Sequence, residues 1–260
     1  MQTREIVFIH GMYMTPLCWE NWIDYYQSKG YRCRAPAWPG REESVETQRR
    51  KHPDPELGRL KLRDVVGHME AVIKSMTGKP VVIGHSMGGL AAQLLLQKDL
   101  AAAVVAIDPA APQGVWTFSW SYVRANFPHI NPLVPVTRPI EMSFPAFQYA
   151  FVNTLPVDQQ RSAYDRYVVP ESRGVPTESL TSVAHIDFQK PHAPLLITAG
   201  EQDHLIPASL NRATYRRYSP NGSVTDFKVF PGRDHFVIGE PGWQEVADFI
   251  LSWLDQKAAS

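Results

Sequence analysis

The sequence predicts an α/β fold, with a mostly parallel central sheet of about six strands, helices on both faces of the sheet and an inserted helical cap. Two observations support this prediction. Short, continuously apolar segments alternate with amphipathic helical segments, which is typical of parallel strands buried on both faces. The composition, with 44% hydrophobic and 20% charged residues in 260, is that of a globular protein long enough to bury one large core.

Six apolar segments are the expected strands, and each ends in a turn or a change of pattern. They are 5–9, 31–35, 81–83, 102–107, 194–199 and 224–230. Apolar residues at helical spacing predict helices at 17–28, 57–76, 90–97, 207–218 and 242–254. Gly78 and Pro80 are expected to end the second of these helices.

The segment 112–190 interrupts this alternation. Twelve of the 22 prolines lie from Pro109 to Pro194, with many aromatic residues among them. Short helices between prolines are expected there, most clearly at 144–153 and 157–167. A stretch of this length inside a compact domain is usually functional. We therefore expect a core formed by 1–111 and 191–260, with 112–190 inserted as a helical cap.

Charge and cysteine content argue against several classes of partner and compartment. The 26 basic and 26 acidic residues balance, so we expect neither nucleic acid nor a membrane as a partner. No apolar run reaches the roughly 20 residues of a membrane span, and the first run is too short for a secretory signal. Cys18 and Cys33 lack redox or zinc spacing and are expected to be reduced thiols of a cytoplasmic protein.

The segment Gly84-His85-Ser86-Met87-Gly88 matches the pattern G-x-S-x-G. This pattern places a serine on a strained turn between a strand and a helix, where its hydroxyl is lifted above the edge of the sheet. The expected strand at 81–83 and the expected helix at 90–97 supply that context. A phosphate-binding loop would instead need G-x-G-x-x-G or a final Lys-Ser/Thr, and neither is present.

A serine nucleophile needs a base, and the base needs an acid that orients it. Asp203 follows the expected strand 194–199, and His235 follows the strand 224–230. Both come after Ser86 in the order Ser, Asp, His that is typical of one hydrolase class. Asp108, at the end of the strand 102–107, stays open as an alternative acid, and so does Glu201.

Other ionisable residues near these positions are assigned supporting roles. The side chains of Asp234 and His204 are expected to point away from the catalytic residues beside them. His10 and His85 are expected to make structural hydrogen bonds near the site. The remaining histidines show no metal-ligand spacing, so no metal site is expected.

Ser86 in G-H-S-M-G-G, Asp203 in G-E-Q-D-H-L-I-P, His235 in G-R-D-H-F and an early F-I-H-G loop together resemble the α/β-hydrolase superfamily, over essentially the whole chain. Because the chain starts with the strand before this early loop, its layout is similar to compact members such as the plant methylesterase and hydroxynitrile lyase group. The resemblance implies a serine esterase that uses no cofactor.

The resemblance also implies an oxyanion hole formed by two backbone amides. These are the amide of Met87, the residue after the nucleophile, and that of Met12 in the early loop, with Tyr13 as a further candidate. A serine at this position disfavours the haloalkane dehalogenase and soluble epoxide hydrolase chemistries of the superfamily, whose nucleophile is a carboxylate. Acyl transfer from an ester to water is the favoured reaction.

The aromatic, apolar cap predicts a small-molecule substrate that is largely uncharged, with an apolar or aromatic part. The residues expected to line its pocket are Tyr13, Trp116, Trp120 and Phe147. For each cap residue, packing of the cap onto the core is the alternative role.

Several questions stay open at this point. Lactone, amide or carbon–carbon bond hydrolysis, cofactor-free lyase or oxygenase chemistry, and a ligand receptor on a hydrolase scaffold are the alternative functions. The oligomeric state, monomer or homodimer, is also open.

Overall fold

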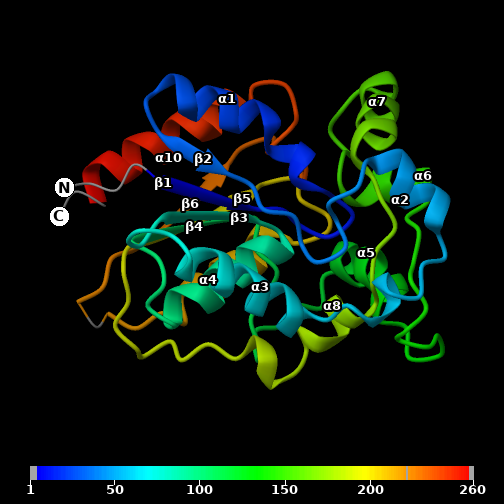
Figure 1. Cartoon of the computed structure of the whole chain (residues 1–260), viewed down its shortest axis with the longest axis horizontal. Helices are drawn as coiled ribbons and strands as arrows, with labels where there is room; N and C mark the ends of the chain where they lie inside the picture. Colours follow the sequence, from blue (N-terminus) through cyan, green and yellow to red (C-terminus); the bar gives the residue numbers. More distant parts are fainter. Residues whose placement is uncertain (1–4, 221, 258–260) are drawn as a thin grey trace.

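Six strands form the central sheet, in the order β2-β1-β3-β4-β5-β6 (Figure 1). The computed structural model describes residues 5–220 and 222–257. The strands are β1 (Glu5–Ile9), β2 (Arg32–Arg34), β3 (Val81–His85), β4 (Ala103–Ile107), β5 (Leu195–Gly200) and β6 (Thr225–Phe230). Each neighbouring pair is parallel. The predicted α/β class and its six-stranded parallel sheet are confirmed.

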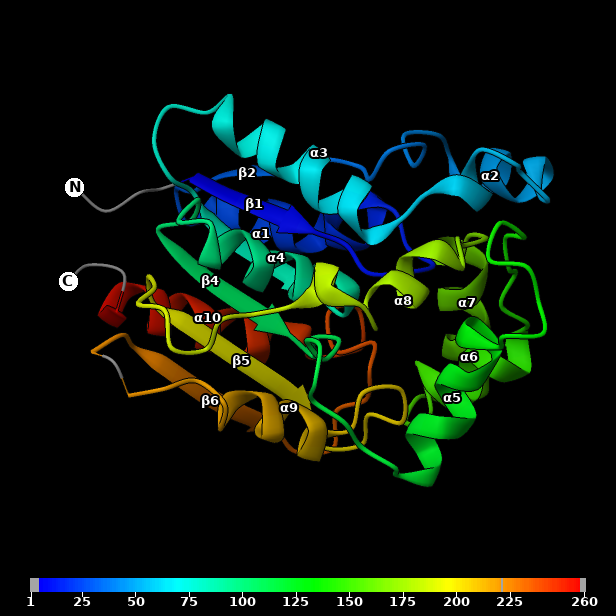
Figure 2. The same ribbon diagram turned by 90° about the horizontal axis from the view of Figure 1, so that it is seen from below.

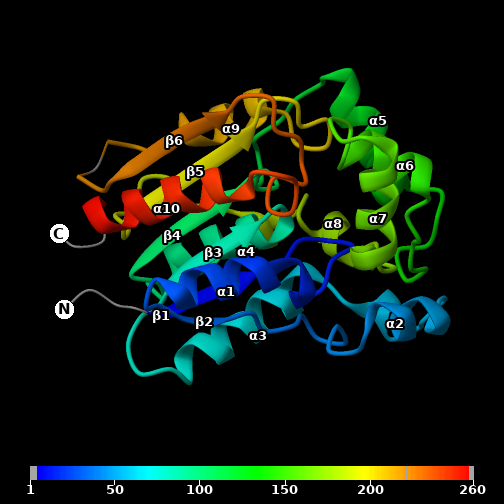
Figure 3. The same ribbon diagram turned by 90° about the horizontal axis from the view of Figure 1, so that it is seen from above.

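Helices cover both faces of this sheet (Figures 2 and 3). One face carries α1 (Glu20–Ser28) and α10 (Trp243–Lys257), and the other carries α3 (Leu62–Lys74), α4 (Met87–Gln97) and α9 (Ala208–Tyr215). The expected helix 17–28 begins as a 3-10 helix, η1 (Pro16–Trp19). Strands β3, β4 and β5 are buried along their whole length between the two layers, which explains their continuously apolar sequences.

The chain changes direction across the sheet between β1 and β3. It runs from β1 outward to the edge strand β2 and then returns to β3 on the other side of β1. In parallel α/β sheets, such a reversal opens a crevice at the carboxyl ends of the strands, where ligands bind. The loops that follow β1, β3, β4, β5 and β6 all leave the sheet at this edge.

Most of the segment 112–190, which we call the cap, lies beyond the carboxyl ends of the strands (Figures 1 and 2), and its last residues run back beside α4, where the Gln97 side chain donates a hydrogen bond to the His185 carbonyl. Its helices are α5 (Trp120–Ile130), α6 (Phe144–Ala150), α7 (Val157–Tyr167), α8 (Gly174–Glu178) and the 3-10 helix η3 (Ser182–Ala184). The bounds of α7 are those expected from the sequence, whereas α6 is shorter than the expected helix 144–153. The cap therefore covers the edge of the sheet at which the crevice opens.

The expected helix 57–76 is divided where it meets the cap. A 3-10 helix, η2 (Leu57–Arg59), is followed by extended backbone at Leu60, and α3 begins at Leu62. The Leu60 carbonyl accepts a hydrogen bond of 2.6 Å from the Ser172 hydroxyl of the cap. A side chain at Gly174 would also collide with this carbonyl. The cap contact thus replaces a helical turn that the apolar spacing alone predicts.

Helix α2 (Val45–Lys51) was not expected, because its sequence has a single apolar residue. It lies beside the cap (Figures 1 and 2), where Arg49 donates hydrogen bonds to the carbonyls of Val168 and Tyr164, at the end of α7. Contacts with the cap therefore stabilise α2 in place of an apolar face. Within the described residues, no helix combines the length and the apolar character needed to cross a lipid bilayer.

Candidate active site

Ser86 occupies a strained turn between β3 and α4. Its backbone has φ 56° and ψ −121°, in the region that disfavours residues other than glycine. Glycines on both sides allow this geometry. A side chain at Gly84 would lie 2.1 Å from the Gly88 carbonyl oxygen, and one at Gly88 would lie 2.3 Å from that of Ile9. Strand and helix thus approach closely, as the G-x-S-x-G pattern requires.

Three residues from three different loops form one chain of hydrogen bonds. His235 Nε2 lies 2.9 Å from Ser86 Oγ, and His235 Nδ1 lies 2.6 Å from Asp203 Oδ2. The other carboxylate oxygen of Asp203 accepts the amide hydrogens of Leu205 and Ile206, at 2.7 and 2.8 Å. Burial raises the pKa of Asp203 well above its usual range, and these two donors act against that shift by favouring the charged form. The three residues that the sequence singled out as nucleophile, base and acid therefore lie together.

The His235 ring is buried. Burial lowers the pKa of His235 to about 3, so the imidazole is neutral at neutral pH. A neutral ring whose Nδ1 hydrogen is donated to Asp203 has its Nε2 lone pair directed at the Ser86 hydroxyl. This is the protonation state that a general base requires.

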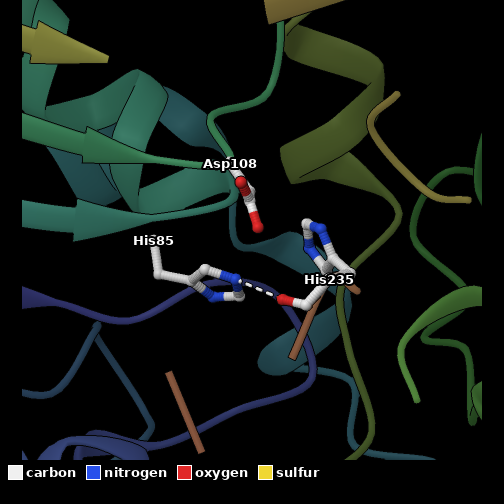
Figure 4. A group of neighbouring side chains, drawn as sticks. All are labelled: His85, Asp108 and His235. Carbon is white, nitrogen blue, oxygen red and sulfur yellow. Dashed lines mark hydrogen bonds between the residues drawn. The ribbon is translucent and has the colours of Figure 1, made fainter. Parts of the chain in front are cut away.

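Asp108 lies beside this chain but does not join it (Figure 4). Its Oδ1 accepts the Gly200 amide hydrogen at 2.7 Å, and its Oδ2 is buried without a hydrogen-bond partner in the described residues. Burial raises the pKa of Asp108 well above its usual range, and the neighbouring Asp203 raises it further. Because the Asp108 carboxyl has no hydrogen bond to His235, it does not orient that ring.

His10 and His85 both make hydrogen bonds to backbone groups near the site. His85 Nε2 donates to the His235 carbonyl oxygen at 2.8 Å, which fixes the loop that carries the base (Figure 4). His10 Nδ1 donates to the Gly11 carbonyl, and its Nε2 accepts the Trp38 amide hydrogen. Both contacts hold backbone next to the proposed nucleophile and base.

The loop after β1 passes directly against the nucleophile. A side chain at Gly11 would lie 2.8 Å from Cβ of Ser86. Met12 and Met87 both line the cavity above Ser86, and neither amide donates a hydrogen bond within the described part of the chain. The Tyr13 amide donates instead to Glu171 Oε2 at 3.0 Å. Met12 and Met87 are thus the two available donors, and Tyr13 is not.

A buried ion pair that sequence reasoning missed holds this loop from the cap side. Arg41 Nη2 lies 2.6 Å from Glu171 Oε1, and both side chains are buried. Glu171 binds the amide of Tyr13, whose φ of 63° is also in the left-handed region. The Tyr13 hydroxyl is hydrogen-bonded to His129 Nδ1 of α5 at 2.6 Å. The strained turn after Met12 is therefore fastened at both its backbone and its side chain.

A cavity rises from Ser86 between the core and the cap. Its wall is mostly apolar, and none of the described residues that line it is an Asp, Glu, Lys or Arg. Of the four residues predicted to line the pocket, Tyr13 and Trp116 do so. Polar groups of the wall that sequence reasoning did not identify are Gln113, Tyr122, Asn126, His129 and Ser179.

The other two predicted pocket residues lie elsewhere. Phe147 is buried inside the cap, where its ring stacks on Phe151 with centroids 5.2 Å apart, and it does not line the cavity. Trp120 is exposed on the outside of α5. The neighbour of Phe147 in this stack, Phe151, is the residue that reaches the cavity, and its ring edge contacts His235. Packing of the cap thus decides which aromatic residues face inward.

The neighbours of the predicted acid and base point away from the site. Asp234 accepts hydrogen bonds from the amide and hydroxyl of Thr154 in the cap. His204 Nδ1 donates to the Tyr149 carbonyl, and Glu201 accepts the Gly232 amide hydrogen. These three side chains fasten the loops around the site to the cap and to one another.

A comparison of the sequence with models of known protein families identifies the family of the chain. A model of the alpha/beta hydrolase family matches residues 6–249. The protein belongs to this family. The six-stranded parallel sheet with its surrounding helices is therefore the fold of an alpha/beta hydrolase.

Similar proteins include several ester hydrolases. Over 62 residues, 24% of the chain, this hydrolase is 37% identical to a monoacylglycerol lipase of Mycolicibacterium smegmatis, of which the match spans only 21%. A monoacylglycerol lipase from Paleococcus ferrophilus superposes with a TM-score of 0.69 at 19% identity, over 96% of this chain and 93% of that chain. A methylesterase from Arabidopsis gives 0.68 at 12% identity, over 96% and 98%. At such identities these two structures show a shared fold.

One group of side chains in the hydrolase has the spacing of a metal site. Ligand atoms of His85, Asp108 and His235 lie within 4.8 Å of one another, and the described residues contain no other such group (Figure 4). Both ring nitrogens of His235 are already hydrogen-bonded to Ser86 and Asp203, and His85 Nε2 is bonded to a carbonyl. The hydrogen bonds that each of these residues makes account for their proximity without a metal ion.

Proposed function

We propose that the protein is a serine hydrolase that cleaves the carboxylic ester of a small, largely apolar or aromatic substrate. The observation that carries the proposal is the hydrogen-bonded chain Asp203–His235–Ser86 at the base of an uncharged cavity. Membership of the alpha/beta hydrolase family supports hydrolase activity. The lipases and the methylesterase to which the chain is similar in sequence or fold favour an ester as the substrate.

In the proposed reaction, Ser86 Oγ attacks the ester carbonyl carbon while His235 Nε2 takes the hydroxyl proton. The negative charge that forms on the carbonyl oxygen accepts hydrogen bonds from the amides of Met12 and Met87. Protonated His235 then gives its proton to the departing alkoxide, and the alcohol leaves an acyl group on Ser86. Asp203 holds the His235 ring and stabilises its charged form.

Water completes the cycle by the same route. His235 takes a proton from the water molecule as it attacks the acyl carbon, and then returns that proton to Ser86 Oγ as the carboxylic acid departs. The apolar wall favours acyl or alcohol groups without charge, because a charged group in the cavity would lose its hydration without gaining an ionic partner.

A serine-directed phosphonate probe, mapped by mass spectrometry, tests the nucleophile, and a panel of esters, lactones and amides tests the substrate class. We expect the probe on Ser86 and turnover of p-nitrophenyl acetate or butyrate. Ser86→Ala should lower kcat by a factor on the order of 10⁶ if the triad acts as a unit. Ser179→Ala, which changes another serine of the cavity wall, is the matched control and should retain activity.

Substantial activity in the Ser86→Ala protein would exclude Ser86 as the nucleophile. Preferential turnover of lactones or amides would keep the mechanism and change the substrate. Saturable binding of a small apolar molecule without turnover, by a protein whose Ser86 still reacts with the probe, would favour a ligand receptor.

A further inference from the structure

Exposed apolar side chains are concentrated in one segment of the cap, which begins at the mouth of the cavity. Most of the large hydrophobic side chains that are exposed in the described residues fall within 116–136, and we call them the apolar rim. They are Trp116, Phe118, Trp120, Val123, Phe127, Leu133 and Val136. Folded proteins seldom expose so many large apolar side chains in one segment unless the surface binds something.

The exposed apolar residues of α5 lie on one face of the helix. Tyr122 and Asn126 point inward and line the cavity. Trp120, Val123 and Phe127 follow helical spacing along the outer face and are exposed. The helix lies at the outer edge of the molecule, on the side opposite the termini (Figures 2 and 3). A helix face turned to water normally carries polar residues, so the outer face of α5 is suited to an apolar neighbour.

Among charged residues, the rim segment itself carries only basic ones, and exposed Glu141, which follows this segment, lines the same surface hollow as Arg124. No Asp or Glu occurs between Pro109 and Ile140, whereas Arg124 and Arg138 are both exposed in this segment. Exposed Arg217, after α9, adds a third cation, and its guanidinium donates to the Gly114 carbonyl at 3.3 Å. The charge balance of the whole chain conceals this local excess. Arginines beside apolar side chains favour a partner surface that is apolar and negatively charged.

The rim is continuous with the cavity above Ser86. Trp116 is 65% exposed and also lines that cavity, as does half-exposed Leu180. A second protein molecule seated on the rim would obstruct this opening. A lipid surface would instead supply apolar molecules to it, and tryptophan rings are favoured at the boundary between water and lipid.

We propose that the apolar rim docks the protein on an anionic lipid surface, with the mouth of the cavity turned toward that surface. The proposal goes beyond ester hydrolysis and does not depend on which reaction the site performs. It replaces the expectation, drawn from the balanced charge of the whole chain, that no membrane is a partner.

Co-sedimentation with vesicles tests the proposal. We expect the protein to bind vesicles of phosphatidylcholine and phosphatidylglycerol in equal amounts, and to bind pure phosphatidylcholine more weakly. The variant F118S/L133S should bind the mixed vesicles at least about tenfold more weakly, since each change removes a large apolar contact with lipid. Phe118 and Leu133 are 91% and 89% exposed and lie outside the cavity wall, so hydrolysis of a soluble ester should be unchanged.

Val157→Ser is the matched control, because Val157 is also exposed on the cap but lies on α7, outside the rim. It should bind vesicles as the wild-type protein does. Absence of vesicle binding by the wild-type protein, or equal binding by F118S/L133S, would overturn the proposal. Sedimentation velocity provides a further criterion: a dimer that F118S/L133S abolishes, without vesicle binding, would assign the rim to a second copy of the chain.

Discussion

Two buried carboxyl groups lie near the ring of His235, and they differ in the hydrogen bonds that they accept. Asp203 accepts hydrogen bonds from His235 and from two backbone amides. Asp108 accepts one, from the Gly200 amide, and burial raises its pKa well above the usual range. Burial raises the pKa of Asp203 as well, and two negative charges in one buried site are unfavourable. We therefore expect the carboxyl that accepts more hydrogen bonds, Asp203, to carry the charge. In the proposed mechanism, only Asp203 orients the base.

Asparagine substitutions should separate the two acids. Asp203→Asn leaves the His235 ring without a carboxylate and should lower kcat/KM by a factor on the order of 10⁴. An asparagine side chain is close in shape to a protonated aspartate, and Asp108 has no bond to His235. Asp108→Asn should therefore retain activity within about tenfold. Both variants are measured on one ester at neutral pH. If Asp108→Asn proves to be the crippled variant, the assignment of the acid is wrong.

At the scale of single elements, the loop after β1 depends on the cap for its conformation. Glu171 of the cap binds both Arg41, from the loop after β2, and the amide of Tyr13. Tyr13 holds a strained backbone conformation next to Met12, the proposed oxyanion donor. The ion pair is buried, so salt screens it much less than it screens an exposed pair. We therefore expect Glu171 to position the Met12 amide.

Glu171→Gln should affect both stability and turnover. An unpaired Arg41 in the interior should lower the free energy of unfolding by about 3 to 5 kcal/mol, as measured by urea denaturation. A looser loop should lower kcat more than it raises KM, because the oxyanion hole acts mainly in the transition state.

Glu20→Gln is the matched control, because Glu20 of α1 pairs with Arg166 of α7 and so also joins the core to the cap, but at an exposed position. We expect it to change the free energy of unfolding by about 1 kcal/mol at most and to leave kcat unchanged. A Glu171→Gln protein that is destabilised but has wild-type kcat would assign Glu171 a purely structural role.

The elements around the site differ in how far the sequence predicts them. Strands β3, β4 and β5 are buried on both faces. Their sequences are therefore short, mostly apolar segments, which local sequence patterns predict. The turn at Ser86 is also local, because its glycines and the nucleophile are neighbours. The contact of Glu171 with Tyr13 joins residues 158 positions apart, and no local pattern indicates it.

The cap shows a second reason why prediction fails. Its aromatic content indicated a pocket wall, yet Phe147 packs inside the cap and Trp120 faces outward. The packing of α5, α6 and α7 against one another decides which side of each helix faces the core. Because α5 has apolar residues on both faces, its sequence does not indicate which face is buried. The same ambiguity concealed the apolar rim.

At the scale of the whole molecule, buried histidines and buried acids set opposing pH dependences of stability. Burial lowers the pKa of His10 to about 3 and that of His129 to about 4. Such a group binds a proton in the unfolded chain before it does in the folded one, so stability falls as pH falls below about 6.5. Burial raises the pKa of Glu240 to about 7, which has the opposite sign because the folded state then binds the proton. The contribution of one group is isolated by comparing the pH dependence of stability of the wild-type protein with that of a variant that lacks the group.

His129→Gln should isolate the contribution of His129, which links α5 to Tyr13 and lies near Arg173, whose charge lowers the pKa of His129 further. Between about pH 4 and pH 6.5, the wild-type protein should lose about 1.4 kcal/mol more of unfolding free energy per pH unit on acidification than the variant does. Urea denaturation at several pH values measures both slopes. Equal slopes for the wild-type and His129→Gln proteins would mean that His129 is protonated in the folded state across this range.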